Sequence, residues 1–134
     1  MPKELYDKFL KMWKPIELLK NTTELLDWDQ ETYMPKGEGE TRAEQMAMLA
    51  EMIHKKLIDD LLYDTLLDLE AIGYRDDRPL NNYQLANIRE ALKEIKCARA
   101  LPSDLVAALA KETSLASDTW QKAREKNSFN DFAP

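Results

Sequence analysis

Apolar side chains recur at steps of three and four residues along almost the whole chain, and this spacing limits the possible fold more than any other feature. The step places apolar groups on one side of an α-helix, whereas a half-buried strand needs strict alternation of apolar and polar residues. Leu5, Phe9 and Trp13 form the first such stripe. The sequence therefore predicts an all-α protein, an antiparallel bundle of about six helices.

Helix boundaries are predicted from prolines, glycines and capping side chains. Pro15 is expected to end or kink the first helix, because proline lacks the N–H that a helix interior uses. Asn21 or Thr22 is expected to cap a second helix, which stops before the turn at residues 34–37. The later stripes predict helices over residues 38–57, over 60–72, from Asn81 or Asn82 onward, and from Pro102 onward.

Length and charge balance exclude several classes of protein. With 134 residues there is room for one compact core, so residues 1–134 are expected to form a single helical domain. The 19 basic and 25 acidic residues give a net charge of −6, and no nucleic-acid partner is expected because such partners require a basic face. With 33% charged residues, a membrane protein is not expected either.

A cytoplasmic location is expected from the cysteine count and the N-terminus. Cys97 is the only cysteine, so no internal disulfide can form. The first residues lack the apolar run of a signal peptide. Both features fit a reducing compartment.

Few residues offer catalytic or metal-binding chemistry. The chain has 3 glycines and 1 histidine, which excludes glycine-rich phosphate loops and any metal site or triad that needs two histidines. Glu51 and His54 match the Glu-x-x-His spacing of di-iron bundles, but that architecture needs two such motifs. His54 is therefore expected at the surface or flank of its helix. No catalytic and no metal-binding residue is assigned.

The densest polar cluster is the stretch 27–32. In a helix, Asp27 and Glu31 lie four residues apart on one side, while Asp29 points elsewhere. Paired carboxylates act as acid and base when burial separates their pKa values, and a small helical enzyme that uses these acids stays open as one interpretation. Solvated or structural carboxylates, with Trp28 packed in the core, are the simpler expectation.

Two stretches of sequence go beyond composition and spacing. The first is Leu-Leu-Asp-Trp-Asp-Gln-Glu-Thr-Tyr-Met-Pro at residues 25–35, followed by Arg-Ala-Glu-Gln at 42–45. The second runs from residues 102–106 through Trp-Gln-Lys-Ala-Arg at 120–124 to Phe129 and the final Phe-Ala-Pro. In this order, over nearly the whole chain, they resemble the N-terminal region of the carboxypeptidase Taq family of zinc metallocarboxypeptidases.

The resemblance implies a protein several times longer, almost entirely helical, cytoplasmic and usually homodimeric, which removes residues one at a time from the free C-terminus of peptides. The family's H-E-x-x-H helix and its other zinc and substrate ligands lie downstream of the region matched here. Zinc is therefore implied for the full-length enzyme and not for this chain. The alternative is a stand-alone helical interaction or dimerisation module derived from the family.

For residues 1–134 the resemblance implies a non-catalytic helical part that covers one side of the substrate groove. The stretch from Asp27 to Tyr33 is expected nearest that groove. If Asp27 and Glu31 instead pair with basic residues of adjacent helices and Trp28 is internal, this assignment loses its basis. The groove candidates are Trp28, Asp29, Gln30 and Tyr33.

The C-terminal residues end the expected domain abruptly. Phe129 and Phe132 stand within a polar stretch that looks like the start of another element. A domain taken from a larger helical protein leaves apolar surface where its neighbours packed. Both phenylalanines are therefore expected to be exposed or covered by a neighbouring copy, and the expected partners are a second copy or the missing catalytic part, with peptide bound only in the full-length protein.

Overall fold

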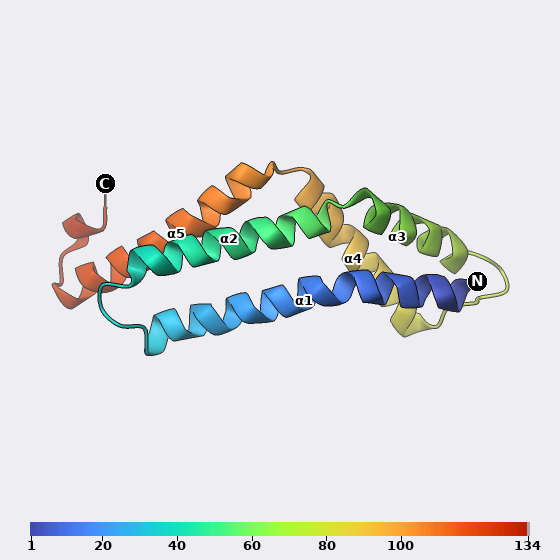
Figure 1. The fold of residues 1–134 in the computed structure, drawn as a ribbon, viewed down its shortest axis with the longest axis horizontal. Helices are drawn as coiled ribbons and strands as arrows, with labels where there is room; N and C mark the ends of the chain where they lie inside the picture. Colours follow the sequence, from blue (N-terminus) through green and yellow to red (C-terminus); the bar gives the residue numbers. More distant parts are fainter. Residues whose placement is uncertain (134) are drawn as a thin grey trace. The chain divides into compact units, whose positions relative to one another are not determined.

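The computed structural model describes residues 1–133, and helices account for most of them (Figure 1). No strand occurs among these residues, so the all-α prediction is confirmed, and the number of helices is close to the number expected. None of the described helices is both long and apolar enough to span a bilayer. The elements are α1 (Pro2–Thr32), α2 (Gly39–Leu57), α3 (Asp60–Gly73), α4 (Asn82–Arg99), α5 (Ser103–Glu125) and the 3₁₀ helix η1 (Phe129–Asp131).

Pro15 does not end the first helix, because α1 continues through it to Thr32. The caps expected at Asn21 or Thr22 are therefore absent, and two expected helices are one. Proline leaves the carbonyl of Lys11 without its usual helical partner. Pro15 is exposed, so water reaches this side of the helix, while the buried Phe9 and Ile16 hold the helix to the core on either side.

Side-chain caps start both α3 and α4, and the cap of α4 is Asn81, one of the two residues expected there. The Asp59 carboxylate accepts a hydrogen bond from the Leu62 N–H at 3.1 Å. Asn81 and Gln84 form a reciprocal capping box, each side chain accepting from the other's backbone N–H at 2.9 Å. These bonds satisfy donors that the first helical turn leaves unpaired.

The chain divides into two compact units. Unit 1 comprises Met1–Lys20 and Ile53–Pro102, and unit 2 comprises Asn21–Met52 and Ser103–Pro134. Unit 1 therefore contains the first part of α1, the end of α2, and all of α3 and α4. Unit 2 contains the second part of α1, most of α2, α5 and η1.

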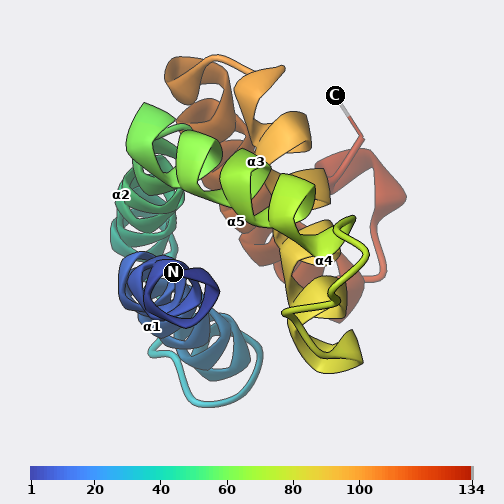
Figure 2. The ribbon, with the colours of Figure 1, turned by 90° about the vertical axis from the view of Figure 1, so that its right-hand side faces the viewer.

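Unit 1 has a continuous apolar core, and Figure 2 shows the ribbons of α3 and α4, which carry much of it. α3 and α4 contribute the largest share because leucine, isoleucine and alanine recur at helical spacing along both. Tyr6 closes the core on one side, where its hydroxyl accepts a hydrogen bond from the Asn87 side-chain amide at 2.8 Å. The buried core residues are Tyr6, Phe9, Ile16, Leu57, Leu62, Leu66, Leu69, Leu80, Ile88, Ala91, Leu92, Ile95 and Ala98.

Unit 2 packs through small residues and polar contacts. Ala43 and Ala123 are its buried apolar side chains among the described residues. Gly39, the first residue of α2, lies so close to α5 that an added Cβ would stand 2.7 Å from Cγ of Asp118. Asp118 also accepts a hydrogen bond from Lys122 at 2.7 Å, and this contact raises the pKa of the Lys122 ammonium above its ordinary value.

Candidate functional site

The 27–35 motif lies at the C-terminal end of α1, inside unit 2, where it meets Arg42 of α2. The Arg42 guanidinium donates to the Asp29 carboxylate at 2.6 Å and to the Leu26 carbonyl at 2.5 Å. Its Nε donates to the Gln45 side chain at 3.0 Å. A cation at the carbonyl end of a helix is favourable, so this network holds α2 against the end of α1.

Gln30 faces inward from the same motif and is only 5% exposed. Its side-chain amide donates to the Ser114 carbonyl at 3.1 Å, and its carbonyl accepts from the Ser114 hydroxyl at 3.0 Å. Both partners belong to α5, so Gln30 joins α1 to α5. Two reciprocal bonds offset the cost of burying this amide.

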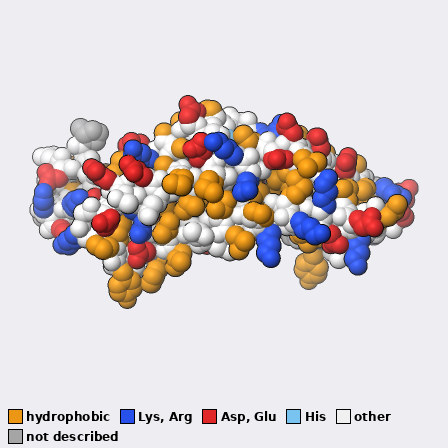
Figure 3. Space-filling model, in the orientation of Figure 1, with side chains coloured by type: hydrophobic (Ala, Val, Ile, Leu, Met, Phe, Trp, Pro, Cys, Tyr) orange, Lys and Arg blue, Asp and Glu red, His pale blue; other side chains and the backbone are white. Residues whose placement is uncertain are grey.

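Trp28 and Tyr33 are exposed, and the expectation that Trp28 packs in the core is wrong. Trp28 is 53% exposed and Tyr33 is 75% exposed, with ring centroids 5.5 Å apart. Apolar side chains protrude from the lower left of Figure 3, where Figure 1 draws the end of α1. Leu25, one turn earlier, is exposed as well.

The four groove candidates therefore divide into two pairs with different environments. Asp29 and Gln30 are occupied by contacts that join helices of unit 2. Trp28 and Tyr33 are the two that present surface to a ligand. The assignment of all four to a substrate groove stays a prediction.

The acid–base alternative gains no support from the geometry. Asp27 and Glu31 are exposed on α1. Asp29 is occupied by its ion pair with Arg42. The three acids therefore do not converge on one site.

The residues present do not fit a zinc centre. Of the surface and helix-flank positions expected for His54, the surface one is wrong, because His54 is buried and its Nε2 lies 2.8 Å from the Ala98 carbonyl oxygen. Among residues 1–133 no group of three or more histidine, cysteine, aspartate or glutamate side chains is placed to hold a metal ion. Catalytic zinc normally takes three protein ligands, and the described residues do not supply such a set.

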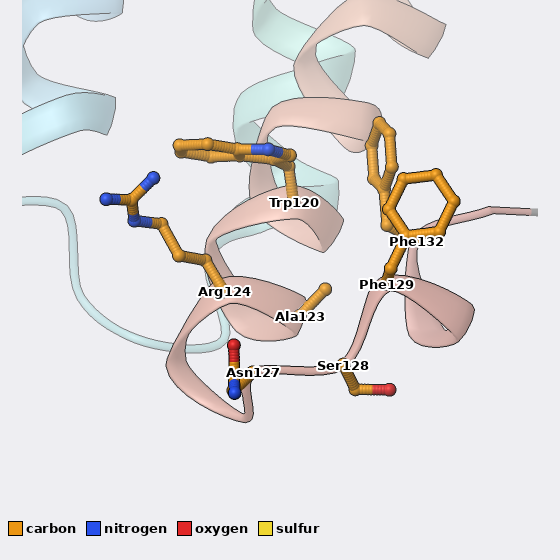
Figure 4. Close-up of a pocket in the computed structure, with 7 residues that line it drawn as sticks. All are labelled: Trp120, Ala123, Arg124, Asn127, Ser128, Phe129 and Phe132. Carbon is orange, nitrogen blue, oxygen red and sulfur yellow. The ribbon is translucent and has the colours of Figure 1, made fainter.

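A second surface feature, not assigned as a site by sequence reasoning, is a cleft at the end of α5 (Figure 4). It has a volume of about 610 Å³. We call it the aromatic cleft. Phe129 is 76% and Phe132 is 38% exposed, which agrees with the exposed alternative predicted for these two residues. The residues lining the cleft are Trp120, Ala123, Arg124, Asn127, Ser128, Phe129 and Phe132.

The elements formed by the described residues are all helical, and in unit 2 the 27–35 motif joins α1 to α2 and α5. The family model for the carboxypeptidase Taq (M32) metallopeptidases matches residues 8–134, and the chain belongs to this family. The predicted resemblance is confirmed.

The chain is also similar in sequence to individual proteins that are named carboxypeptidases. The chain is 32% identical over 133 residues to "Thermostable carboxypeptidase 1" of Thermus thermophilus, covering 99% of this chain and 26% of the relative. It is 28% identical over 134 residues to the protein of the same name from Pyrococcus furiosus, covering 98% of this chain and 25% of the relative. The chain thus spans about a quarter of the length of the curated relatives it matches.

A solved structure shows the same fold. The structure described as "The Structure of CHT" superposes with a TM-score of 0.66 at 27% identity, covering 96% of this chain and 25% of that one. A quarter-length match therefore recurs in three dimensions as well as in sequence.

Proposed function

We propose that this chain acts as the N-terminal helical part of a zinc metallocarboxypeptidase that removes residues from the C-terminus of peptides. In this role it covers one side of the substrate groove and carries no catalytic residue. Membership of the metallopeptidase family over residues 8–134, and two relatives that are named carboxypeptidases, support the proposal. The cytoplasmic location and the homodimer expected from the sequence belong to the same proposal.

The observation that carries the proposal is the mismatch between the family's chemistry and this chain's residues. A metallopeptidase needs a bound metal, yet the single histidine is buried against a backbone carbonyl and no group of metal ligands is formed among residues 1–133. In relatives about three quarters of the chain lies outside the matched region. The proposal therefore assigns the zinc site to that remainder.

The 27–35 motif would then shape the groove wall without taking part in the chemistry. The Asp29–Arg42 ion pair and the Gln30–Ser114 hydrogen bonds fix the end of α1 against α2 and α5. Trp28 and Tyr33 are thereby held at the surface with their rings in contact. Peptide sites combine an apolar lining with a few placed polar groups, and an aromatic pair with one phenolic hydroxyl supplies both.

A second candidate function is a stand-alone interaction or dimerisation module derived from the family. The observation in its favour is the amount of apolar surface on unit 2, which includes Met48, Leu109 and Phe129 at more than half exposure. Such surfaces mark places where another protein packs. A module of this kind would associate with itself or with a full-length relative and would need no peptide.

The test is a chimera in which this chain replaces the matched quarter of the Thermus thermophilus relative. The proposal expects the chimera to release C-terminal residues from peptides in a zinc-dependent manner, and expects the isolated chain with zinc to release none. Release by the isolated chain, free of contaminating proteases, would contradict it. A folded chimera without activity would contradict it too.

A matched pair of tyrosine variants tests the groove wall in the same chimera. Tyr33→Ala is expected to raise KM several-fold at unchanged kcat, because it removes a contact made equally in the ground and transition states. Tyr83→Ala is the control, since Tyr83 is 85% exposed but lies in unit 1. Equal KM values for the two variants would remove Tyr33 from the groove.

A further inference from the structure

The aromatic cleft has the composition of a protein-binding hot spot. Trp120, Phe129, Phe132 and Arg124 line one concave surface of unit 2. Tryptophan and arginine are the residues most enriched among those that dominate binding energy, and phenylalanine is enriched at interface centres. In Figure 4 the Trp120 ring and the two phenylalanine rings border the same space.

The cleft is built by a well-defined helix end. The Ser128 N–H donates to the Ala123 carbonyl at 2.9 Å and the Asn127 N–H donates to the Arg124 carbonyl at 3.0 Å. Asn127 has φ of 53°, so these bonds form the Schellman motif that reverses the chain after α5. The path that leads to both phenylalanines is therefore fixed by backbone bonds.

The 3₁₀ helix η1 then orients the phenylalanine pair. The N–H groups of Phe132 and Ala133 both donate to the Phe129 carbonyl, at 3.0 and 2.9 Å. Across the turn, Nζ of Lys126 forms an ion pair with Oδ2 of Asp131 at 3.5 Å. The two rings have centroids 6.4 Å apart. A surface that is already ordered loses less conformational entropy when a partner binds.

Arg124 gives the cleft a charge that its lining does not balance. The guanidinium lies 5.3 Å from the centroid of the Trp120 ring, and among residues 1–133 it makes no ion pair. The lining contains no acidic residue. An occupant that combines an apolar side chain with a carboxylate would satisfy both the rings and the guanidinium.

We propose that the aromatic cleft is the docking site for the remainder of the peptidase chain, through a segment that inserts an apolar side chain and presents a carboxylate to Arg124. The proposal rests on the proposed function. In relatives the remainder is about three times the length of the matched quarter, so a large partner is available. A second copy fits less well, because a two-fold contact of this cleft with itself brings like charges together and supplies no carboxylate from its lining.

Binding of the chain to the Thermus thermophilus relative with its matched quarter deleted tests the inference. The deleted relative is used once a cooperative thermal transition shows that it is folded. The inference expects a one-to-one complex that Phe129→Ala and Arg124→Glu each weaken about tenfold or more. Circular dichroism of the exposed-site variants checks that their helix content is unchanged.

Two matched controls locate the effect in the cleft. Tyr83→Ala removes a comparably exposed aromatic side chain from α4, and Lys111→Glu makes the same charge reversal on α5 outside the cleft. Both are expected to leave the dissociation constant within about twofold. A complex that the cleft variants do not weaken would overturn the docking site while leaving the proposed function intact.

The remaining outcomes also decide the question. Self-association that Phe129→Ala abolishes, with no binding to the deleted relative, would assign the cleft to a second copy and overturn the inference. If the deleted relative does not fold, oxidative labelling of Trp120 in the chimera replaces the binding assay. Labelling reduced about tenfold relative to the isolated chain supports docking, and equal labelling overturns it. Peptidase activity of the chimera is scored separately, so failure of the proposed function is recognised independently.

Discussion

Units 1 and 2 are of similar size and both are helical, yet different forces hold them together. Unit 1 buries large aliphatic and aromatic side chains such as Phe9, Leu66 and Ile95. In unit 2 the buried side chains among the described residues are Gln30, Ala43, Ser114 and Ala123, while both of its tryptophans and both of its phenylalanines are exposed. Unit 1 has the core of a self-sufficient domain, whereas unit 2 has the surface of one that packs against something else.

The difference follows from where apolar area is removed from water. Burying one large aliphatic side chain contributes about 1.5–3 kcal/mol, so the core of unit 1 supplies most of the favourable free energy of folding. Reciprocal amide hydrogen bonds contribute about 1 kcal/mol each, because they replace bonds to water. Unit 2 therefore gains orientation from its polar network and gains little stability.

The largest expected effect is a core truncation in unit 1. Leu66 is fully buried, and Leu66→Ala is expected to lower the free energy of unfolding by about 2–5 kcal/mol, through lost burial and the cavity left behind. Urea denaturation followed by circular dichroism measures the change. Leu109→Ala in unit 2, at a leucine that is 53% exposed, is the control and is expected to stay within about 0.5 kcal/mol. Equal losses of unfolding free energy in the two variants would contradict the claim that unit 1 has the stronger apolar core.

Breaking the polar network of unit 2 is expected to cost less. Gln30→Ala leaves the Ser114 hydroxyl and carbonyl without their partner, and a loss of about 1–3 kcal/mol is expected. Amide exchange of α5 measures whether the loss falls in unit 2. Gln45→Ala removes an exposed amide from the neighbouring Arg42 network and serves as the control. An unchanged exchange rate at α5 would show that Gln30 does not join the helices.

A substitution at Pro15 in unit 1 is expected to raise the stability of the protein, whereas the substitutions above lower it. Pro15→Ala restores the missing N–H at an exposed position of α1 and is expected to raise stability by about 1–2 kcal/mol, after the greater freedom of the unfolded chain is counted. The melting temperature measures the gain. A lower melting temperature would mean that the proline is required in the helix.

The smallest effect is expected at a helix cap. Asn81→Ala removes the side-chain bond to the Gln84 N–H and is expected to cost about 1 kcal/mol. Asn82→Ala, at the next residue, which is exposed too, is the control for the change of residue type. A cost at Asn82 that matches the cost at Asn81 would argue against the capping box.

Local sequence signals predicted most of the helices. They failed where contacts between residues far apart in the sequence determine whether a helix continues. The starts of α3 and α4 were predictable because their caps are neighbours in sequence. The continuity of α1 through Pro15 was not predictable from local sequence. The burial of Phe9 and Ile16 outweighs the tendency of proline to interrupt a helix.

The candidate site shows the same limit. Gln30 forms hydrogen bonds with Ser114, which lies 84 residues away on α5, and no sequence pattern near Gln30 predicts this contact. His54 is buried for a similar reason, because its partner carbonyl is 44 residues away. The exposure of Phe129 and Phe132 was predictable, because a polar stretch of sequence offers few neighbouring apolar side chains to bury the two rings.

The central claim, that unit 1 is stable by itself and unit 2 is a surface awaiting a partner, is tested most directly by native-state hydrogen exchange of the isolated chain. We expect the slowest amides in α3 and α4, around Leu66, Leu69 and Ile95, to exchange only through global unfolding. Amides of α5 around Ser114 are expected to exchange at least tenfold faster, through opening of unit 2. Equal protection of α5 and of α3 and α4 would contradict the claim.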